Sequence, residues 1–152
     1  MTENRESWDE FYLGLSKYVA LKRSKDPSTK VGAAIVRPDH TLCSIGYNGF
    51  PKSMPDVPSL YANREEKLSR IVHAEINAKD NAREPVIGYT LYTWPFMSCD
   101  RCFVQMANAG IVRFVSPIAT PDQLERWGEA FTRVRQYARE MNVQIVELDM
   151  PA

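Results

Sequence analysis

The chain has 152 residues and a mass of 17.4 kDa; 44% of its residues are hydrophobic and 25% are charged. These values fit a single domain over residues 1–152, and they exclude a disordered chain or a small disulfide scaffold. The 19 Lys and Arg residues balance the 19 Asp and Glu residues. This balance argues against a nucleic-acid partner, because such proteins usually carry a basic excess. A small phosphorylated ligand remains compatible with a net charge of zero.

The cysteine content and the absence of long apolar runs indicate where in the cell the protein is located. Three cysteines, Cys43, Cys99 and Cys102, are too few for a disulfide framework and favour a reducing environment. The first ten residues are polar and acidic and do not resemble a signal peptide. No apolar run approaches the roughly 18 residues of a membrane span. We therefore expect a cytoplasmic protein with no membrane partner.

The first expected element is a helix that a capping box of Ser7 and Glu10 opens. Two short strands at 31–36 and 41–47, joined by a turn, form a β-hairpin. An irregular, proline-rich loop follows at 48–60, and a loop of that length inside a compact domain is often functional. The later elements are expected as helices over 71–83, 99–109 and 122–141 and as strands over 88–94, 111–115 and 143–148.

The order of these elements, α-β-β-α-β-α-β-α-β, indicates an α/β fold with a central sheet and helices on both faces. The last helix carries apolar residues every three or four positions, among them Trp127 and Phe131. We interpret this stripe as core or subunit interface rather than as a cofactor site.

Two short motifs, each at the start of an expected helix, hold the residue types of a metal site. His73 and Glu75 form H-x-E, and Cys99 and Cys102 form C-x-x-C, whose cysteines share one helix face. Two thiolates and an imidazole suit Zn²⁺, and three protein ligands leave a position open, as in catalytic zinc sites. Unpaired N–H groups at the helix starts favour the thiolates. Glu75 is placed to move protons between water and substrate rather than to bind the metal.

Each motif alone is weak evidence. C-x-x-C also occurs in redox and structural zinc sites, and a single histidine is more often a core residue than a ligand. A redox role would leave His73 and Glu75 without a function, and a structural zinc usually has four protein ligands. The coincidence of both motifs favours one catalytic zinc per chain over a non-catalytic zinc-binding module. The third cysteine, Cys43, is expected to be a small core residue.

Around these motifs the chain resembles the zinc-dependent cytidine deaminase superfamily, whose signature is H-x-E followed by P-C-x-x-C, with the Glu as acid and base. More narrowly, it is similar to the deoxycytidylate (dCMP) deaminase family. The similarity runs from about residue 24 to 117 and rests on S-K-D-P-S-T-K-V-G-A (24–33), G-Y-N-G-F-P (46–51), H-A-E-I-N-A (73–78) and A-G-I (109–111). The resemblance implies a three-layer α/β/α fold with a central mixed five-stranded sheet. It also implies hydrolytic deamination of dCMP to dUMP and ammonia.

The resemblance further assigns roles to individual residues. It implies one zinc ion per subunit held by His73, Cys99 and Cys102, with Glu75 protonating N3 of cytosine and helping ammonia leave. It implies substrate contacts by Lys25, Ser28, Asn48 and Ala74, with Lys25 and Ser28 at the 5′-phosphate, and effector contacts by Tyr47 and Gly49. The family also implies a homo-oligomer, a hexamer, that dCTP activates and dTTP inhibits, with Mg²⁺ accompanying a nucleotide effector.

Some positions depart from the family pattern. Ser98 precedes Cys99 where the family has Pro, the loop 93–98 looks one residue longer than usual, and Lys79 stands where an aliphatic residue is common. Because that loop borders the substrate pocket in the superfamily, a modified dCMP or a guanine-type base stays open as substrate. A deaminase of tRNA or another nucleic acid is the weaker alternative. Trp94 is expected either to stack on the base or to pack. Residues 48–72 contain neither His nor Cys, so a single zinc is expected.

Overall fold

A computed structural model of the chain describes residues 4–150, in which five strands form one mixed sheet with the order β2-β1-β3-β4-β5. β1 pairs antiparallel with both β2 and β3, whereas the β3–β4 and β4–β5 pairs are parallel. The strands are β1 (Gly32–Val36), β2 (Leu42–Tyr47), β3 (Thr90–Trp94), β4 (Arg113–Pro117) and β5 (Gln144–Leu148).

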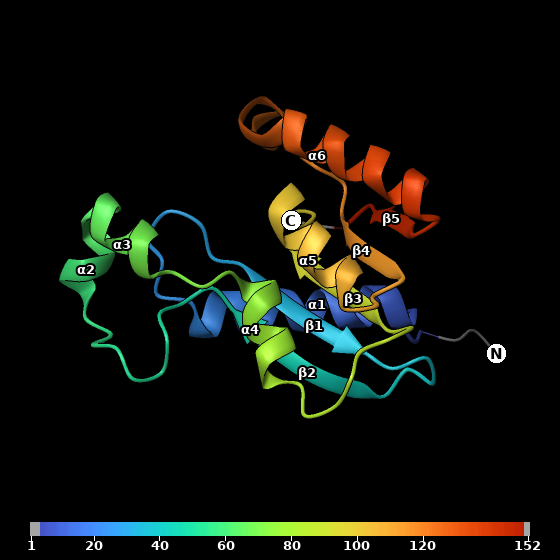
Figure 1. Cartoon of the computed structure of the whole chain (residues 1–152), viewed down its shortest axis with the longest axis horizontal. Helices are drawn as coiled ribbons and strands as arrows, with labels where there is room; N and C mark the ends of the chain where they lie inside the picture. The colour runs from blue at the N-terminus through green and yellow to red at the C-terminus, as the bar shows by residue number, and fades with distance from the viewer. Residues whose placement is uncertain (1–3, 151–152) are drawn as a thin grey trace.

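Helices cover both faces of this sheet (Figure 1). α1 lies against one face, while α4, α5 and α6 lie on the other; α2 and α3 project beyond the β1–β2 end of the molecule. The helices are α1 (Trp8–Arg23), α2 (Pro58–Ala62), α3 (Arg64–Arg70), α4 (Ala74–Asn81), α5 (Asp100–Asn108) and α6 (Pro121–Met141). The expected three-layer α/β/α arrangement around a mixed five-stranded sheet is therefore confirmed.

The alternation of side chains along β1 explains why both faces are covered. Ala34 and Val36 face α1 and pack with Leu13, whereas Ala33 and Ile35 face the opposite helices. All five residues of β1 are buried, as expected for a strand with a helix layer on each side. The larger core lies on the α4–α5–α6 face, so the helices that carry the two motifs are fixed by packing.

Two glycines allow helices to approach the sheet very closely. A Cβ atom on Gly46 of β2 would lie 2.3 Å from the backbone nitrogen of Ala78 and 2.5 Å from the carbonyl oxygen of Ala74. A Cβ atom on Gly32 of β1 would lie 2.0 Å from the carbonyl oxygen of Ser16 in α1. Only glycine permits these contacts, and the contact at Gly46 places α4 directly on β2.

The helix expected over 71–83 is present as α4, but it is shorter than expected. Ile71 ends α3, and α4 begins only at Ala74, after the N-cap His73. The two short helices α2 and α3 were not predicted, because the stretch before α4 is rich in proline. Their signals were present, because Pro58 occupies the first turn of α2 and the Asn63 side chain accepts a hydrogen bond from the Glu66 N–H at 3.2 Å.

The bounds of two other elements differ slightly from the predicted ones. The strand expected over 111–115 is displaced to Arg113–Pro117, and α6 begins at Pro121 after a Thr120–Gln123 capping box rather than at Asp122. The Ser7–Glu10 capping box of α1 is present as predicted. Within residues 4–150, no helix has the length and apolar character needed to cross a bilayer.

Candidate active site and metal centre

The two sequence motifs meet at the facing ends of α4 and α5. His73 is the N-cap of α4, Cys99 is the N-cap of α5, and Cys102 lies in the first turn of α5. One ligand atom from each residue lies within 4.8 Å of the other two. His73 Nδ1 is 3.1 Å from Cys102 Sγ and 3.8 Å from Cys99 Sγ. The structure thus brings together the three residues that were predicted to bind zinc.

Backbone contacts hold the start of α4 in place. Gly49 and Val72 form an isolated antiparallel bridge, with N–H···O distances of 3.1 and 2.8 Å, immediately before His73. The Asn77 side chain donates to the Tyr47 carbonyl at 2.8 Å. These bonds tie the end of β2 to the entry of α4, so the orientation of His73 is set by the sheet.

The electrostatics of the cluster suit a metal cation. The Cys102 thiol, and after it His73, lower the pKa of the Cys99 thiol to about 4 by hydrogen bonding, against the opposing effect of burial. The Cys102 backbone N–H also donates to Cys99 Sγ at 3.4 Å. These hydrogen bonds favour the thiolate form of Cys99. A thiolate, a second sulfur and an imidazole nitrogen that converge on one point match the donor set that Zn²⁺ prefers.

Glu75 lies next to this cluster and is only 4% exposed. Burial raises the pKa of its carboxyl group; its own backbone N–H and the nearby His73 offset part of that rise. A buried carboxyl group whose pKa is moved toward neutrality can both accept and return a proton. Ser98 stands where the family motif has proline, and its buried hydroxyl oxygen has no hydrogen-bond partner among residues 4–150.

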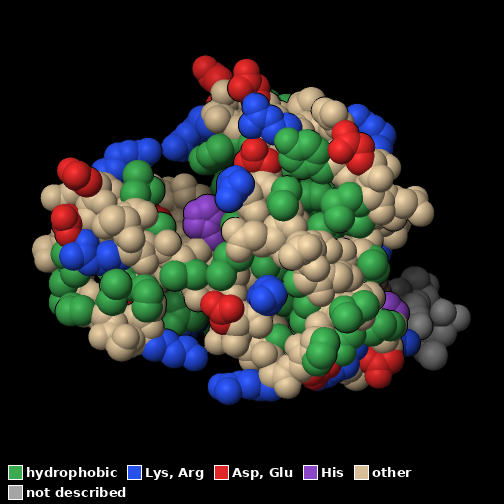
Figure 2. All heavy atoms as spheres, in the orientation of Figure 1, with side chains coloured by type: hydrophobic (Ala, Val, Ile, Leu, Met, Phe, Trp, Pro, Cys, Tyr) green, Lys and Arg blue, Asp and Glu red, His purple; other side chains and the backbone are tan. Residues whose placement is uncertain are grey.

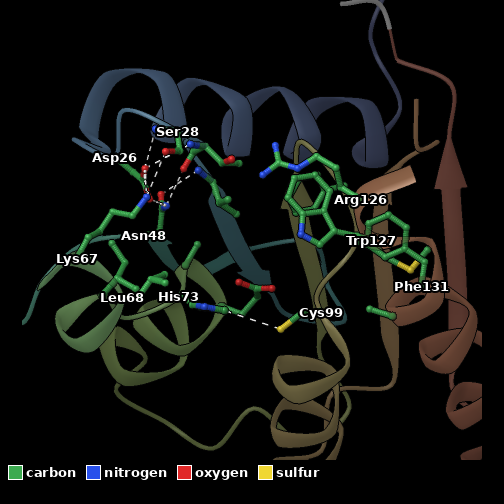
Figure 3. Close-up of a pocket in the computed structure, with 18 of the residues that line it drawn as sticks. Asp26, Ser28, Asn48, Lys67, Leu68, His73, Cys99, Arg126, Trp127 and Phe131 are labelled. Atoms are coloured by element: carbon green, nitrogen blue, oxygen red, sulfur yellow. Dashed lines mark hydrogen bonds and ion pairs between the residues drawn. The ribbon is translucent and has the colours of Figure 1, made fainter. Parts of the chain in front are cut away.

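The cluster opens into a cavity of about 250 Å³ (Figure 3). Figure 2 shows a hollow on the same face of the molecule, with a histidine side chain at its wall. The lining comes from the loop before β1, the end of β2, α3, the start of α4, the loop before α5, and α6. Phe96 and Trp127, whose ring centroids are 4.5 Å apart, form an apolar wall across from Glu75.

The four predicted substrate residues differ in whether they line the cavity. Ser28, Asn48 and Ala74 line the cavity, whereas Lys25 does not. Lys25 Nζ lies 2.9 Å from Asp56 Oδ2, and its side chain is 54% exposed. The structure therefore does not bring Lys25 together with the site residues.

Asn48 has a role that the sequence did not predict. Its amide oxygen accepts from Ser24 Oγ at 2.6 Å and from the Val31 N–H at 2.9 Å. Its amide nitrogen donates to Asp26 Oδ2 at 3.3 Å and to the Thr29 carbonyl at 2.8 Å. These four bonds use the whole hydrogen-bonding capacity of an amide. In this structure the Asn48 side chain lines the cavity and orders the loop before β1.

The remaining predicted residues lie outside the cavity lining. Tyr47 is contacted by the Arg23 guanidinium, 5.7 Å from its ring centroid, and Gly49 acts through the backbone bridge to Val72. Trp94 also lies outside the lining and is covered by Lys17, whose Nζ is 5.9 Å from the ring centroid. The structure therefore does not place Trp94 where it could stack on a base in this cavity.

Several lining residues were missed from the sequence. Trp127 and Phe131, interpreted only as core or interface, also form the cavity wall, together with Arg126 from the same helix. Arg64 and Lys67 come from α3, which was not predicted at all. No local pattern marks these residues, because α3 and α6 reach the cavity only through the tertiary fold.

Comparisons with known proteins agree with the geometry. Residues 6–117 match the family model for the cytidine and deoxycytidylate deaminase zinc-binding region. An uncharacterized deaminase in the luxG 3′ region of Aliivibrio fischeri is 32% identical over 143 residues, covering 94% of this chain and 95% of that protein. The human deoxycytidylate deaminase is 34% identical over 110 residues, covering 68% of this chain and 61% of that protein.

The fold comparison points the same way. The dCMP deaminase of cyanophage S-TIM5, solved in complex with dCMP and dUMP, superposes with a TM-score of 0.72 at 19% identity. The match covers 96% of this chain and 100% of that one. The match spans less than two thirds of the human relative, and the region that matches the family model contains both motifs. With a family model covering most of its length and the His-Cys-Cys cluster in place, this chain belongs to the cytidine and deoxycytidylate deaminase family.

Proposed function

We propose that this protein is a zinc-dependent enzyme that hydrolyses dCMP to dUMP and ammonia. The observation that carries the proposal is the buried Glu75 carboxyl group beside the converging His73, Cys99 and Cys102, at the inner end of one cavity. Relatives named deoxycytidylate deaminase in human and mouse, and a phage dCMP deaminase with the same fold, support dCMP as the substrate.

In this proposal His73, Cys99 and Cys102 hold one Zn²⁺ ion. When bound, zinc supplies a Lewis acid that activates water for attack on an amidine carbon. Glu75 takes a proton from the attacking water and delivers it to N3 of the base. Glu75 then takes the remaining proton from the hydroxyl group now on C4 and passes it to the amino group, so that the C4–N bond breaks and ammonia leaves as the C4 carbonyl forms.

The rest of the cavity matches a nucleotide. The apolar surfaces of Phe96 and Trp127 would contact the base and exclude water from the reacting carbon. Ala74 is the first residue of α4, and the His73 side chain makes no capping bond to that helix. The first N–H groups of a helix have no partner within it, so the Ala74 N–H can donate to the base.

The family resemblance also supports proposals on assembly, regulation and location. We expect a homo-oligomer, a hexamer, in which residues 1–152 form one deaminase domain, with dCTP activating and dTTP inhibiting. Tyr47 and Gly49 are the proposed effector contacts, and Mg²⁺ would bind only with a nucleotide effector. A cytoplasmic location is the expectation from the cysteine content, since Cys43, Cys99 and Cys102 are all free thiols.

An ammonia-release assay over a panel of substrates tests the proposal. The panel is dCMP, CMP, dCTP, deoxycytidine, 5-substituted dCMP, guanine and a tRNA anticodon stem-loop. We expect the highest kcat/KM with dCMP. A clear preference for guanine, for a modified dCMP or for the RNA would replace the substrate and keep the deaminase chemistry. Zinc-loaded protein that releases ammonia from none of them would overturn the proposed function.

A further inference from the structure

The cavity has a reactive end and a basic end. In Figure 3, His73 and Cys99 lie in the lower part of the pocket, whereas Ser28 lies above them on the left and Arg126 lies above them on the right, on the α6 side. Lys and Arg side chains border the hollow on the surface (Figure 2). A ligand that reacts next to Glu75 would therefore extend toward positively charged groups.

Of the three basic residues that line the cavity, one is already neutralised. Lys67 is 5% exposed, and its Nζ lies 3.0 Å from Asp26 Oδ1 and 3.3 Å from Ser28 Oγ. This buried pair holds the loop before β1 in place. Since the Lys67 charge is balanced by Asp26, it adds little attraction for a ligand anion.

The other two basic residues, Arg64 and Arg126, are not neutralised. Within residues 4–150, neither guanidinium forms an ion pair or a hydrogen bond with a protein group, and both side chains are exposed. A guanidinium has five N–H donors in a planar fork that matches phosphate oxygens. The cavity thus contains two unused anion-binding groups, one from α3 and one from α6.

Arg126 is oriented before any ligand binds. Its guanidinium carbon lies 4.4 Å from the centroid of the Trp127 ring, and Trp127 in turn packs on Phe96. Stacking on an aromatic ring limits the conformations of an arginine side chain without using its N–H donors. Figure 3 shows Arg126 and Trp127 side by side on the α6 side of the pocket.

Lys25, the residue that the family motif suggests for a phosphate, is already engaged elsewhere. Its Nζ pairs with Asp56 Oδ2 at 2.9 Å and donates to the Asp56 carbonyl at 3.1 Å, outside the cavity lining. Ser28 is better placed. Its Oγ accepts from Lys67, which leaves its own O–H free to donate.

We propose that Arg64 and Arg126 bind the 5′-phosphate of a nucleoside monophosphate in this cavity, with the Ser28 hydroxyl as a further donor and without Lys25. This assignment deepens the proposed function and rests on it for the orientation of the nucleotide. It makes Arg126 and Arg64 the residues that distinguish a nucleotide from a nucleoside.

The experiment compares Arg126→Gln, Arg64→Gln and the double variant with the wild type in two assays. The first measures kcat and KM for dCMP and for deoxycytidine. The second measures binding of dUMP and of deoxyuridine by isothermal titration calorimetry, which does not depend on turnover. Arg139→Gln, an exposed arginine of α6 outside the cavity lining, is the matched control, and Lys25→Gln tests the motif-based alternative.

We expect each single variant to raise the KM for dCMP and the Kd for dUMP about tenfold to a hundredfold, the effect of one charge-assisted hydrogen-bonding group. Deoxycytidine kinetics, deoxyuridine binding and the Arg139→Gln protein should be unchanged. Arg126→Lys should recover part of the loss, because it restores the charge but not the planar fork.

Three results would overturn the assignment: equal losses on nucleotide and nucleoside, no loss in the double variant, or a loss confined to Lys25→Gln. A wild type that binds dUMP no more tightly than deoxyuridine would also overturn it. If the wild type deaminates neither substrate but prefers dUMP in the binding assay, the proposed reaction fails while the phosphate assignment stands.

Discussion

At the scale of single residues, the proposed chemistry depends on the different environments of neighbouring groups. Hydrogen bonds from its neighbours lower the pKa of the Cys99 thiol, whereas burial raises the pKa of the Glu75 carboxyl group. The two carry different tasks, since one is a metal ligand and the other is a proton carrier. Removing either should therefore abolish activity for different and measurable reasons.

The variant Glu75→Gln separates these tasks. The amide preserves the size of the side chain but cannot carry a proton, so we expect kcat to fall by several orders of magnitude while the zinc content stays at one per chain. Cys102→Ser is the contrasting variant and should lose zinc together with activity, because a ligand thiolate is gone. Zinc content follows from elemental analysis. A Glu75→Gln protein with activity within about tenfold of the wild type would show that another group carries the proton.

At the scale of elements, α1 is fixed to the sheet by a charged cluster far from the cavity. The Arg113 guanidinium of β4 donates to both Asp9 carboxylate oxygens, at 2.8 and 2.6 Å, and the Tyr92 hydroxyl of β3 donates to Asp9 at 2.7 Å. The hydrogen bonds from Arg113, and then that from Tyr92, lower the pKa of Asp9 against the effect of burial. The cluster connects residues 104 positions apart in the sequence.

We expect Asp9→Asn to lower the free energy of unfolding at pH 7 by about 1–3 kcal/mol, because it removes the charge that Arg113 and Tyr92 face. The pKa of Asp9 is lower in the folded than in the unfolded state. Its contribution is therefore complete above the unfolded value of about 3.9 and is lost as the pH falls through the folded value. The difference between wild type and variant should accordingly shrink below about pH 4.

Denaturant unfolding at several pH values measures this difference. Asp149→Asn, at an exposed acidic residue outside the helices and strands, is the matched control and should change stability little. A difference for Asp9→Asn that stays constant from pH 7 to pH 3 would mean that the Asp9 charge is not the source of the stability.

At the scale of the whole molecule, the surface of α1 suggests association. Four large apolar side chains of this helix, Trp8, Phe11, Tyr18 and Leu21, are between 47% and 63% exposed. Monomeric proteins seldom gather such groups on one element without covering them. We therefore expect light scattering to give a mass of several chains of 17.4 kDa, and six if the family resemblance holds. A mass of about 17 kDa at micromolar concentration would remove the assembly proposal and, with it, most of the basis for the effector proposal.

The sequence by itself determined the parts of this protein that depend on local spacing. The capping box at Ser7, the hairpin of β1 and β2, and the C-x-x-C motif at a helix start are patterns within a few residues, and all three were confirmed. The metal donors were also predictable, because Zn²⁺ prefers Cys and His ligands and the chain has only Cys43 and His40 of these types outside the two motifs.

The tertiary structure alone decided which groups face the cavity and which are already satisfied. Lys25 and Asn48 lie in specific motifs, yet one is paired with Asp56 and the other has its amide fully bonded within the protein. Arg126 and Trp127 lie in no motif, yet the packing of α6 brings them to the cavity. The physical reason is that a side chain's availability to a ligand depends on its hydrogen-bond partners, and packing between distant segments chooses those partners.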